Sequence, residues 1–147
     1  MTHSSRTVFL VDGLNLYHSV RQARYNNFAT TEWLDLRNLC SSYLPLIGKH
    51  AGELAQLERV VYFSASPTHL SRGKQESHEV YMRYLQKTEV EVELGKFKPK
   101  SVCYSQSQRG QEAPRHEEKQ TDVAIATRLL EVCLSDEADT VVLVTGD

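Results

Sequence analysis

Four short runs of apolar and β-branched residues recur along the chain, at positions 7–11, 59–64, 90–94 and 140–145. Three of them are nearly continuous, which is typical of strands buried on both faces of a parallel sheet. In the run 90–94, apolar residues instead alternate with Glu91 and Glu93. That alternation predicts a strand with one face in water, so we expect 90–94 at the edge of the sheet.

Between the strand-like runs, apolar residues recur at helical spacing in the segments 34–46, 75–87 and 122–134. Thr121 and Asp122 are both suited to cap the last helix, because their side-chain oxygens accept backbone N–H groups. The alternation of strands and helices indicates right-handed βαβ crossovers. The sequence therefore predicts an α/β fold, in which helices cover both faces of a mainly parallel sheet to give three layers.

The segment 96–120 has a different character from the rest of the chain. It is rich in Ser, Gln and basic residues and shows no hydrophobic period. We therefore expect a long loop here. In compact domains, loops of this length are usually functional lids or poorly ordered segments.

Length and composition fit one globular domain spanning residues 1–147. Hydrophobic residues make up 40% of the chain and charged residues 24%, enough for a core without disulfide or metal staples. The formal net charge is −2, so a nucleic-acid partner would need a local basic patch. The 3 cysteines are far apart, and no signal-peptide pattern or membrane-length apolar run is present. We therefore expect a cytoplasmic protein without a membrane partner.

Acidic residues stand where the predicted elements meet. Asp12 and Asp147 each end a strand-like run, and Asp122 begins the helix that leads into the last strand. The carboxyl ends of parallel strands share one crevice, and a crossover helix runs antiparallel to its strands, so that it starts at the same edge. The sequence therefore predicts that three carboxylates converge.

Converging carboxylates repel one another unless a cation compensates their charge. Oxygen ligands without paired His or Cys favour Mg²⁺ or Mn²⁺, and such ions assist the hydrolysis of phosphodiesters. His116 and Cys103 lack a partner at metal-ligand spacing, so the sequence does not favour zinc. Glu117 and Glu118 offer a fourth carboxylate or are solvated loop residues.

Each acidic residue also has a simpler interpretation. Asp12 followed by Gly13 is a common turn signal, and Asp122 alone is more often a helix cap. Asn15 is a candidate cap for the first helix, or its amide orients a water molecule or a phosphate. The metal-site hypothesis therefore depends on the combination, since separate caps and turns would not need to share one edge of a sheet.

Three blocks together resemble the NYN domain family of PIN-like ribonucleases: VFLVDGLNL at 8–16, EKQTDVAIA at 118–126 and VLVTGD at 142–147. The blocks occur in the family's order and span nearly the whole chain. The resemblance implies a Rossmann-like PIN fold and divalent-metal-dependent cleavage of RNA. It assigns the metal to Asp12, Asp122 and Asp147. It also implies that Asn15 belongs to the site and that Lys119 matches a basic residue common in relatives.

The chain departs from the family pattern in two places. Relatives typically continue past the Gly-Asp pair into a second acidic residue, a further strand and a closing helix. We therefore expect a sheet without its C-terminal closing elements, as in a domain shortened at that end. Some relatives also carry cysteine pairs in the segment matching 96–115, where this chain has only Cys103.

The leading hypothesis is a metal-dependent endoribonuclease, with Tyr104 as a candidate for base stacking. Point charges suffice to hold an RNA backbone, and the candidates are Arg72, Lys74, Lys96, Lys98, Lys100, Arg109, Arg115 and Lys119. The alternative is a non-catalytic RNA-binding or protein-interaction module on the same fold. A small-molecule phosphatase is disfavoured, because no Asp-x-Asp pair follows the first strand and no Gly-rich phosphate loop is present. The oligomeric state is left open, a homodimer included.

Overall fold

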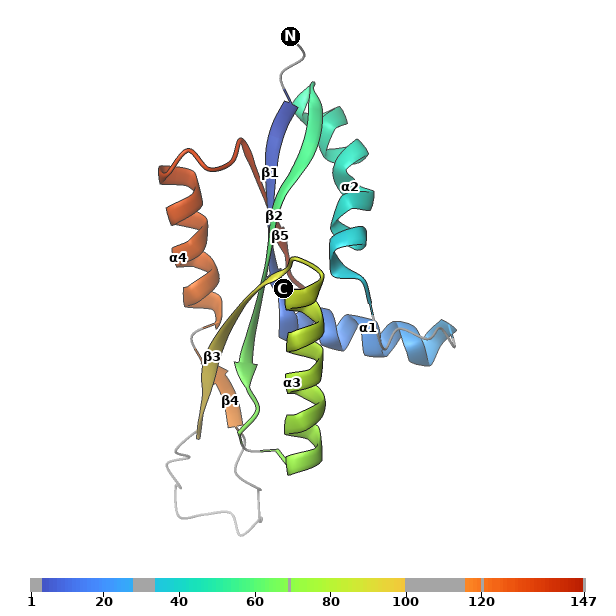
Figure 1. Cartoon of the computed structure of the whole chain (residues 1–147), viewed down its shortest axis with the longest axis vertical. Helices are drawn as coiled ribbons and strands as arrows, with labels where there is room; N and C mark the ends of the chain where they lie inside the picture. The colour runs from blue at the N-terminus through green and yellow to red at the C-terminus, as the bar shows by residue number, and fades with distance from the viewer. Residues whose placement is uncertain (1–3, 28–33, 69, 100–115, 120, 147) are drawn as a thin grey trace, which may run out of the picture.

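The computed structural model describes residues 4–27, 34–68, 70–99, 116–119 and 121–146, in nine helices and strands (Figure 1). Their order along the chain is β1 (Ser4–Asp12), α1 (Gly13–Asn27), α2 (Leu36–Ala51), β2 (Leu54–Ser66), α3 (Arg72–Lys87), β3 (Glu91–Pro99), β4 (His116–Lys119), α4 (Thr121–Leu134) and β5 (Thr140–Val144). Within these residues, no helix combines the length and the apolar character that crossing a bilayer requires.

The described strands form one sheet in the order β4-β3-β2-β1-β5. Strands β3, β2, β1 and β5 are parallel, and β4 joins β3 antiparallel. The chain starts in β1, moves outward through β2 and β3, and returns to place β5 on the other side of β1. The expectation of an α/β, Rossmann-like fold with a mainly parallel sheet is confirmed.

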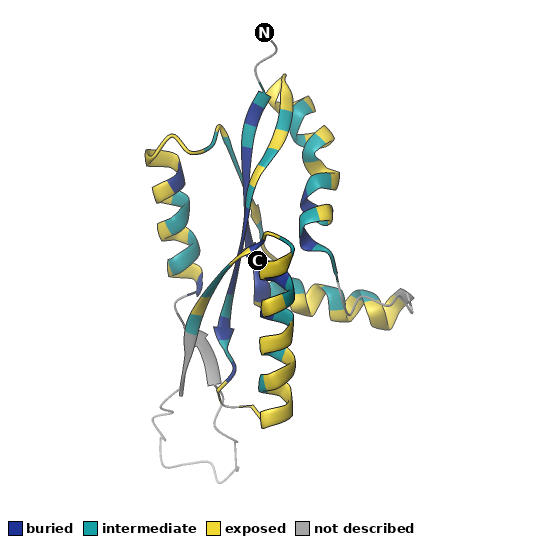
Figure 2. Ribbon diagram, viewed as in Figure 1, coloured by how far each residue is buried: buried dark blue, intermediate teal, exposed yellow. Residues whose placement is uncertain are grey.

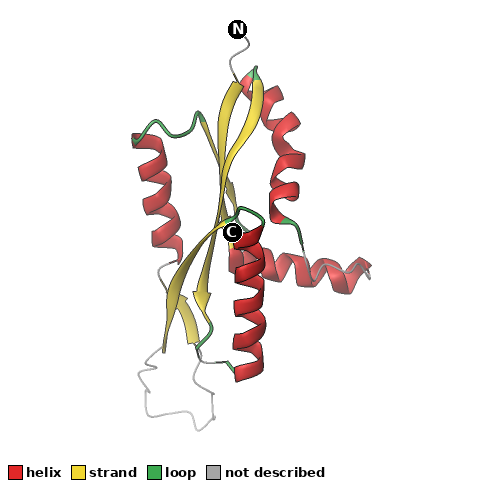
Figure 3. Cartoon of the chain, viewed as in Figure 1, coloured by secondary structure: helices red, strands yellow, loops and turns green. Residues whose placement is uncertain are grey.

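Helices cover both faces of this sheet (Figure 3). Alternate residues of β1 and β2 point to opposite faces, because side chains alternate along a strand. One face packs against α2 and α3 in a core that includes Phe9, Val11, Val60, Tyr62, Leu36 and Leu85. The other face packs against α4 in a smaller core of Val8, Leu10, Val61, Phe63 and Val132. The apolar runs of β1 and β2 are thus buried on both faces as predicted, whereas residues 54–59 of β2 are exposed or half-buried (Figure 2).

The run 90–94 lies at the edge of the sheet as predicted, since residues 91–94 pair with β2 alone among the described strands. Further along β3, strand β4 pairs with it from Lys96↔Lys119 to Pro99↔His116. The predicted loop 96–120 therefore contributes strand residues at both of its ends, and its middle lies outside the described residues. Glu93, expected in water, accepts a 2.8 Å hydrogen bond from Arg128 Nε of α4. The polar face of β3 is thus partly covered by an ion pair.

Strand β5 was expected to be fully buried, and that prediction is wrong. None of its residues is fully buried, and Leu143 is 47% exposed. The reason is its position: among the described strands β5 pairs with β1 alone, so its outer side has no described strand beside it.

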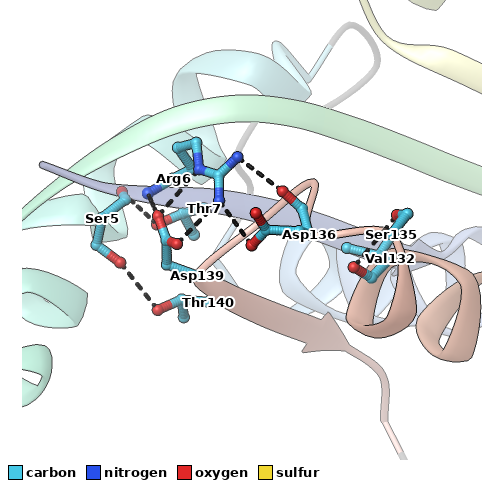
Figure 4. A network of polar contacts seen from close by, with 8 residues as sticks. All are labelled: Ser5, Arg6, Thr7, Val132, Ser135, Asp136, Asp139 and Thr140. Carbon is cyan, nitrogen blue, oxygen red and sulfur yellow. Dashed lines mark hydrogen bonds and ion pairs between the residues drawn. The ribbon is translucent and has the colours of Figure 1, made fainter.

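A polar network holds β5 against β1 at the end of the strands where both begin (Figure 4). Arg6 donates to both carboxylate oxygens of Asp139, at 3.1 and 3.0 Å, and to the backbone oxygen of Asp136 at 2.8 Å. Ser5 and Thr140 share a 3.1 Å hydroxyl contact beside it. The hydrogen bonds to Asp139 raise the pKa of Arg6. These contacts join the start of β5 to β1 and so support the pairing of the two strands.

Candidate functional site

Asp12 is the last residue of β1 and caps the helix that follows. Its Oδ1 atom accepts hydrogen bonds from the backbone N–H groups of Leu14 and Asn15, both at 3.1 Å. This is the geometry of an N-cap, in which a side chain satisfies the free donors of the first helical turn. The cap is therefore Asp12, whereas Asn15, the candidate cap of the sequence, lies inside the first turn. The carboxylate is only 7% exposed.

Gly13 lets the helix start directly against the sheet. A Cβ atom at this position would lie 2.4 Å from the Tyr62 ring and 2.5 Å from the Phe63 carbonyl oxygen. Gly13 is helical and does not have a positive φ, so the Asp-Gly pair is not a turn signal here. Glycine is needed because backbone of α1 passes close to β2. That approach fixes the direction in which Asp12 faces.

Asn15 connects the ends of β1 and β5. Its Nδ2 atom donates to Asp12 Oδ2 at 2.8 Å and to the hydroxyl oxygen of Thr145 at 3.2 Å. Gly146 lies alongside, where an added Cβ would sit 3.5 Å from Asn15 Cγ. The sequence did not single out Thr145. The available signal was its position at the end of the last strand-like run, where the carboxyl ends of the parallel strands meet.

Asp122 lies in the first turn of α4, across from Asp12. Both line one pocket of about 200 Å³. The remaining lining comes from β1, β5 and α4: Leu10, Ile125, Ala126, Leu129, Leu143, Val144 and Thr145. The structure therefore brings Asp12 and Asp122 to one basin at the carboxyl edge of the sheet. The volume exceeds that of several water molecules, which occupy about 30 Å³ each in the liquid.

The pocket occupies a switch point of the sheet. From β1 the chain leaves toward β2 on one side, and it returns to β5 on the other side. Helix α4 lines the pocket, and α1, which begins directly after Asp12, lies on the opposite face of the sheet (Figure 1). Open α/β sheets bind ligands in the crevice that forms at such a point, outside the carboxyl ends of the strands. The order of the strands alone therefore predicts a binding crevice at this place, whatever residues line it.

Negative charge in the pocket has no nearby compensation from described side chains. Elsewhere the acidic residues of the sheet face arginines: Asp139 and Asp136 meet Arg6, and Glu93 meets Arg128. Neither Asp12 nor Asp122 forms an ion pair with any Lys or Arg that the structure describes. Two carboxylates over an apolar floor favour the binding of a cation.

The donor set of the pocket fits a hard divalent cation. It offers carboxylate and hydroxyl oxygens, and these are the ligands that Mg²⁺ and Mn²⁺ prefer. Asp12 Oδ1 already accepts two hydrogen bonds, whereas Oδ2 accepts one. A carboxylate oxygen has about two lone-pair sites, so Oδ2 keeps one for an ion. Asp12 therefore suits a monodentate ligand that Asn15 orients from the side.

The third predicted ligand, Asp147, lies outside the described residues. Within those residues no group of three His, Cys, Asp or Glu side chains is placed to hold a metal. Of the three predicted ligands, the structure therefore places Asp12 and Asp122 in one pocket. The role of Asp147 stays a prediction.

The predicted RNA-binding residues fall into three groups. Lys100, Arg109 and Arg115 lie outside the described residues. The backbones of Lys96, Lys98 and Lys119 belong to the β3–β4 pair, and their side chains are not described. Arg72 and Lys74 are exposed in the first turn of α3, where Arg72 also donates to Glu76 at 3.0 Å. Of the two whose side chains are described, neither Arg72 nor Lys74 lines the pocket.

Strand register places part of this basic set at the edge that holds the pocket. Asp12 is level with Phe63 of β2, and Lys96 pairs with Ser66, further along the same strand. Helix α3 starts after the carboxyl end of β2, so Arg72 and Lys74 begin at that edge too. The positions of Lys96, Arg72 and Lys74 along the chain thus lie beyond the level of Asp12, and neither Arg72 nor Lys74 forms an ion pair with it.

Comparison with protein-family models, curated proteins and solved structures found no match to this chain. The resemblance of its three sequence blocks to the NYN domain family therefore stays a prediction. What the chain does has to be proposed from the geometry of the pocket and from the residues around it.

Proposed function

We propose that this protein is a metal-dependent endoribonuclease that hydrolyses RNA phosphodiester bonds. One observation carries the proposal: Asp12 and Asp122, far apart in the sequence, line a single pocket at the switch point of a parallel sheet. No described cationic side chain pairs with either carboxylate. A pocket of this kind favours a divalent ion, and the hydrolysis of phosphodiesters is a reaction that such ions assist.

In this proposal some residues would bind the metal ion and others would hold its ligands in place. Asp12 and Asp122 would hold Mg²⁺ or Mn²⁺, and Asp147 is the predicted third ligand. Such an ion supplies a Lewis acid for a phosphoryl oxygen and an activated water nucleophile. Asn15 holds Asp12 in place through its 2.8 Å hydrogen bond and is itself held by Thr145. This support matters because metal ligands act well only when their orientation is fixed.

Two features support RNA as the substrate. Basic residues begin or continue at the carboxyl edge of the sheet, including Lys96 of β3 and both Arg72 and Lys74 of α3. Contacts of this type neutralise phosphates and position a nucleic acid without reading its sequence. The second feature is the resemblance of the three sequence blocks to the NYN domain family, whose members cleave RNA.

The test is cleavage of a single-stranded RNA by the whole chain, with Mn²⁺, with Mg²⁺ and with EDTA. We expect cleavage that requires the metal and that falls by at least about a hundredfold in Asp122→Asn. Asp122 makes no hydrogen bond that the variant would break among the described residues, and the change keeps its size. The matched control is Asp35→Asn, at the start of α2 and outside the pocket, which should cleave at the wild-type rate.

Three outcomes would contradict the proposal. If Asp122→Asn and the wild type cleaved RNA at the same rate, Asp122 would have no role in the reaction. If EDTA left the cleavage rate unchanged, the reaction would not require a metal ion. If RNA is bound in EDTA but never cut with either ion, the chain is the non-catalytic RNA-binding module that the sequence left as an alternative.

A further inference from the structure

Helix α1 starts at the pocket and leads away from the sheet. Its first residue, Gly13, follows Asp12, and the helix projects outward from the layer formed by α2 and α3 (Figure 1). Leu16 packs against the larger core, on the inner side of the helix. Most other residues of α1 are exposed (Figure 2). The structure thus presents a long helical face next to the proposed active site.

The exposed face of α1 combines aromatic rings with positive charge. Tyr17, Arg21 and Tyr25 follow one another at intervals of four residues, so they lie along one stripe of the helix. Tyr17 is 55% exposed and Tyr25 is 70% exposed. The guanidinium carbon of Arg21 lies 5.9 Å from the centre of the Tyr25 ring. These three side chains form what we call the α1 stripe.

The charge of α1 favours an anionic partner. The helix contains Arg21 and Arg24 but no Asp or Glu, although the whole chain has a formal net charge of −2. Elsewhere Arg72 is paired with Glu76 and Arg37 with Glu89. In the α1 stripe, by contrast, the described neighbours of Arg21 are the tyrosine rings. Arginine held against aromatic rings is an arrangement that binds single-stranded nucleic acid.

The helix that carries the stripe begins at the proposed active site. The backbone N–H of Leu14, at the start of the helix, donates to Asp12 Oδ1 at 3.1 Å. With a rise of about 1.5 Å per residue, the helix carries the stripe roughly 20 Å from Asp12 to Tyr25. A strand lying along this stripe would therefore reach the pocket at one end.

We propose that the α1 stripe binds unpaired bases of single-stranded RNA and leads the strand to the Asp12–Asp122 pocket. The inference rests on the proposed function and specifies its substrate class. Tyr17 and Tyr25 stack against bases, and Arg21 contacts a phosphate or stacks beside them. A duplex keeps its bases stacked inside the helix and cannot offer their faces to these rings.

The experiment measures binding of a fluorescein-labelled single-stranded RNA by fluorescence anisotropy in EDTA, where metal-dependent cleavage is absent. We expect the double variant Tyr17→Ala/Tyr25→Ala to bind at least about tenfold more weakly, since base stacking is worth roughly 1–3 kcal/mol per base. The matched control is Tyr43→Ala on α2, where the removed ring is 51% exposed but has no described arginine against it. This control should bind like the wild type.

Two further arms identify what the stripe recognises. Arg21→Gln should reduce the slope of log K against log salt by about 0.7, the value for one phosphate contact on a single strand. A duplex RNA of the same sequence should lose little affinity on removal of the two tyrosines. Circular dichroism should show that all variants keep the wild-type fold, because the changed side chains are exposed.

The outcomes separate this inference from the proposed function. If the tyrosine variant binds within about twofold of the wild type while the chain still cleaves RNA, the α1 stripe is not the binding surface and the nuclease proposal stands. The proposal for the stripe would also be wrong if the tyrosine variant lost as much affinity for duplex RNA as for single-stranded RNA. It would be wrong as well if Tyr43→Ala lost as much affinity for single-stranded RNA as the tyrosine variant does. If the variant loses binding but the wild type never cleaves RNA with Mg²⁺ or Mn²⁺, the nuclease proposal fails and the stripe survives.

Discussion

Two helices of this protein begin with the same local chemistry. Asp12 and Asn15 stand at the start of α1, and Asp35 and Asn38 stand at the start of α2. In each pair one carboxylate oxygen accepts the asparagine backbone N–H, at 3.1 and 2.9 Å. The other oxygen accepts the asparagine side-chain amide, at 2.8 and 2.7 Å. As helix caps the two pairs are equivalent.

The two pairs differ in what surrounds them. Asp12 is 7% exposed and lines the pocket with Asp122, and the Asn15 amide also reaches Thr145 beyond β5. Asp35 is more exposed, and among the described residues the side chains of Asp35 and Asn38 bond only within their own turn. A cap is therefore a local property of four residues. A site requires a second strand and a second helix that bring further polar groups to the same cap.

The largest difference between the pairs should appear in RNA cleavage. Asp12→Asn keeps an oxygen for the cap but removes the negative charge from the pocket. We expect metal-dependent cleavage to fall by at least about a hundredfold, because a metal ligand is lost. Asp35→Asn makes the same chemical change in the other cap and should leave the rate unchanged. Initial rates with Mn²⁺, measured well below the unfolding temperature, decide between the two.

A stable fold in both variants is needed for this comparison. Asparagine caps helices about as well as aspartate, so both proteins should unfold near the wild-type temperature. Equal activity in the two variants would mean that Asp12 is a cap and nothing more, as its simpler interpretation holds.

The central part of the fold could be predicted because its residues have few alternatives. The central stretches of β1 and β2 are buried on both faces, and only nearly continuous apolar runs satisfy that environment. Strand β5 has a similar run, yet Leu143 is 47% exposed. The order of strands decides exposure at the edge, and order is a property of the whole chain. Strand β4 consists of His116, Glu117, Glu118 and Lys119, which carry no strand pattern, so its pairing with β3 could not be foreseen.

The candidate site was predictable in its acidic residues and not in its supports. The meeting of Asp12, at a strand end, with Asp122, at a helix start, follows from the rules of parallel sheets, whereas the place of Asp147 stays a prediction. The role of Thr145 depends on where the Asn15 amide points, and the close contact of Gly13 depends on Tyr62 and Phe63. Such contacts join residues from different elements, and their side-chain directions are set by packing rather than by local sequence.

The next difference should appear when a second carboxylate is added to each pair. Asn15→Asp would place a negative charge where an amide now lies 2.8 Å from Asp12 Oδ2. In this buried setting we expect the free energy of unfolding to fall by about 2 kcal/mol without metal, because like charges repel strongly there. Asn38→Asp adds the same charge in a more exposed turn, where we expect a loss within about 0.5 kcal/mol. Urea unfolding in EDTA measures both.

Adding Mn²⁺ makes this test sharper. An ion that binds the folded state stabilises it in proportion to the logarithm of its concentration above the dissociation constant. Asn15→Asp should therefore regain stability with Mn²⁺, whereas Asn38→Asp should not respond more than the wild type. Two variants that respond equally would show that the pocket does not bind the ion.

The smallest difference should lie in the caps themselves. Asp35→Ala removes one cap at a partly solvated turn, and we expect the free energy of unfolding to fall by about 1 kcal/mol. Asp12→Ala leaves the N–H groups of Leu14 and Asn15 and the Asn15 amide without their acceptor at a position that is 7% exposed. Because buried donors are costly to leave unpaired, we expect a loss of about 2 kcal/mol. Urea denaturation of both variants measures the difference. If the free energy of unfolding fell no more in Asp12→Ala than in Asp35→Ala, burial would not strengthen the cap at Asp12. The two caps would then differ only in that Asp12 lines a pocket that binds an ion.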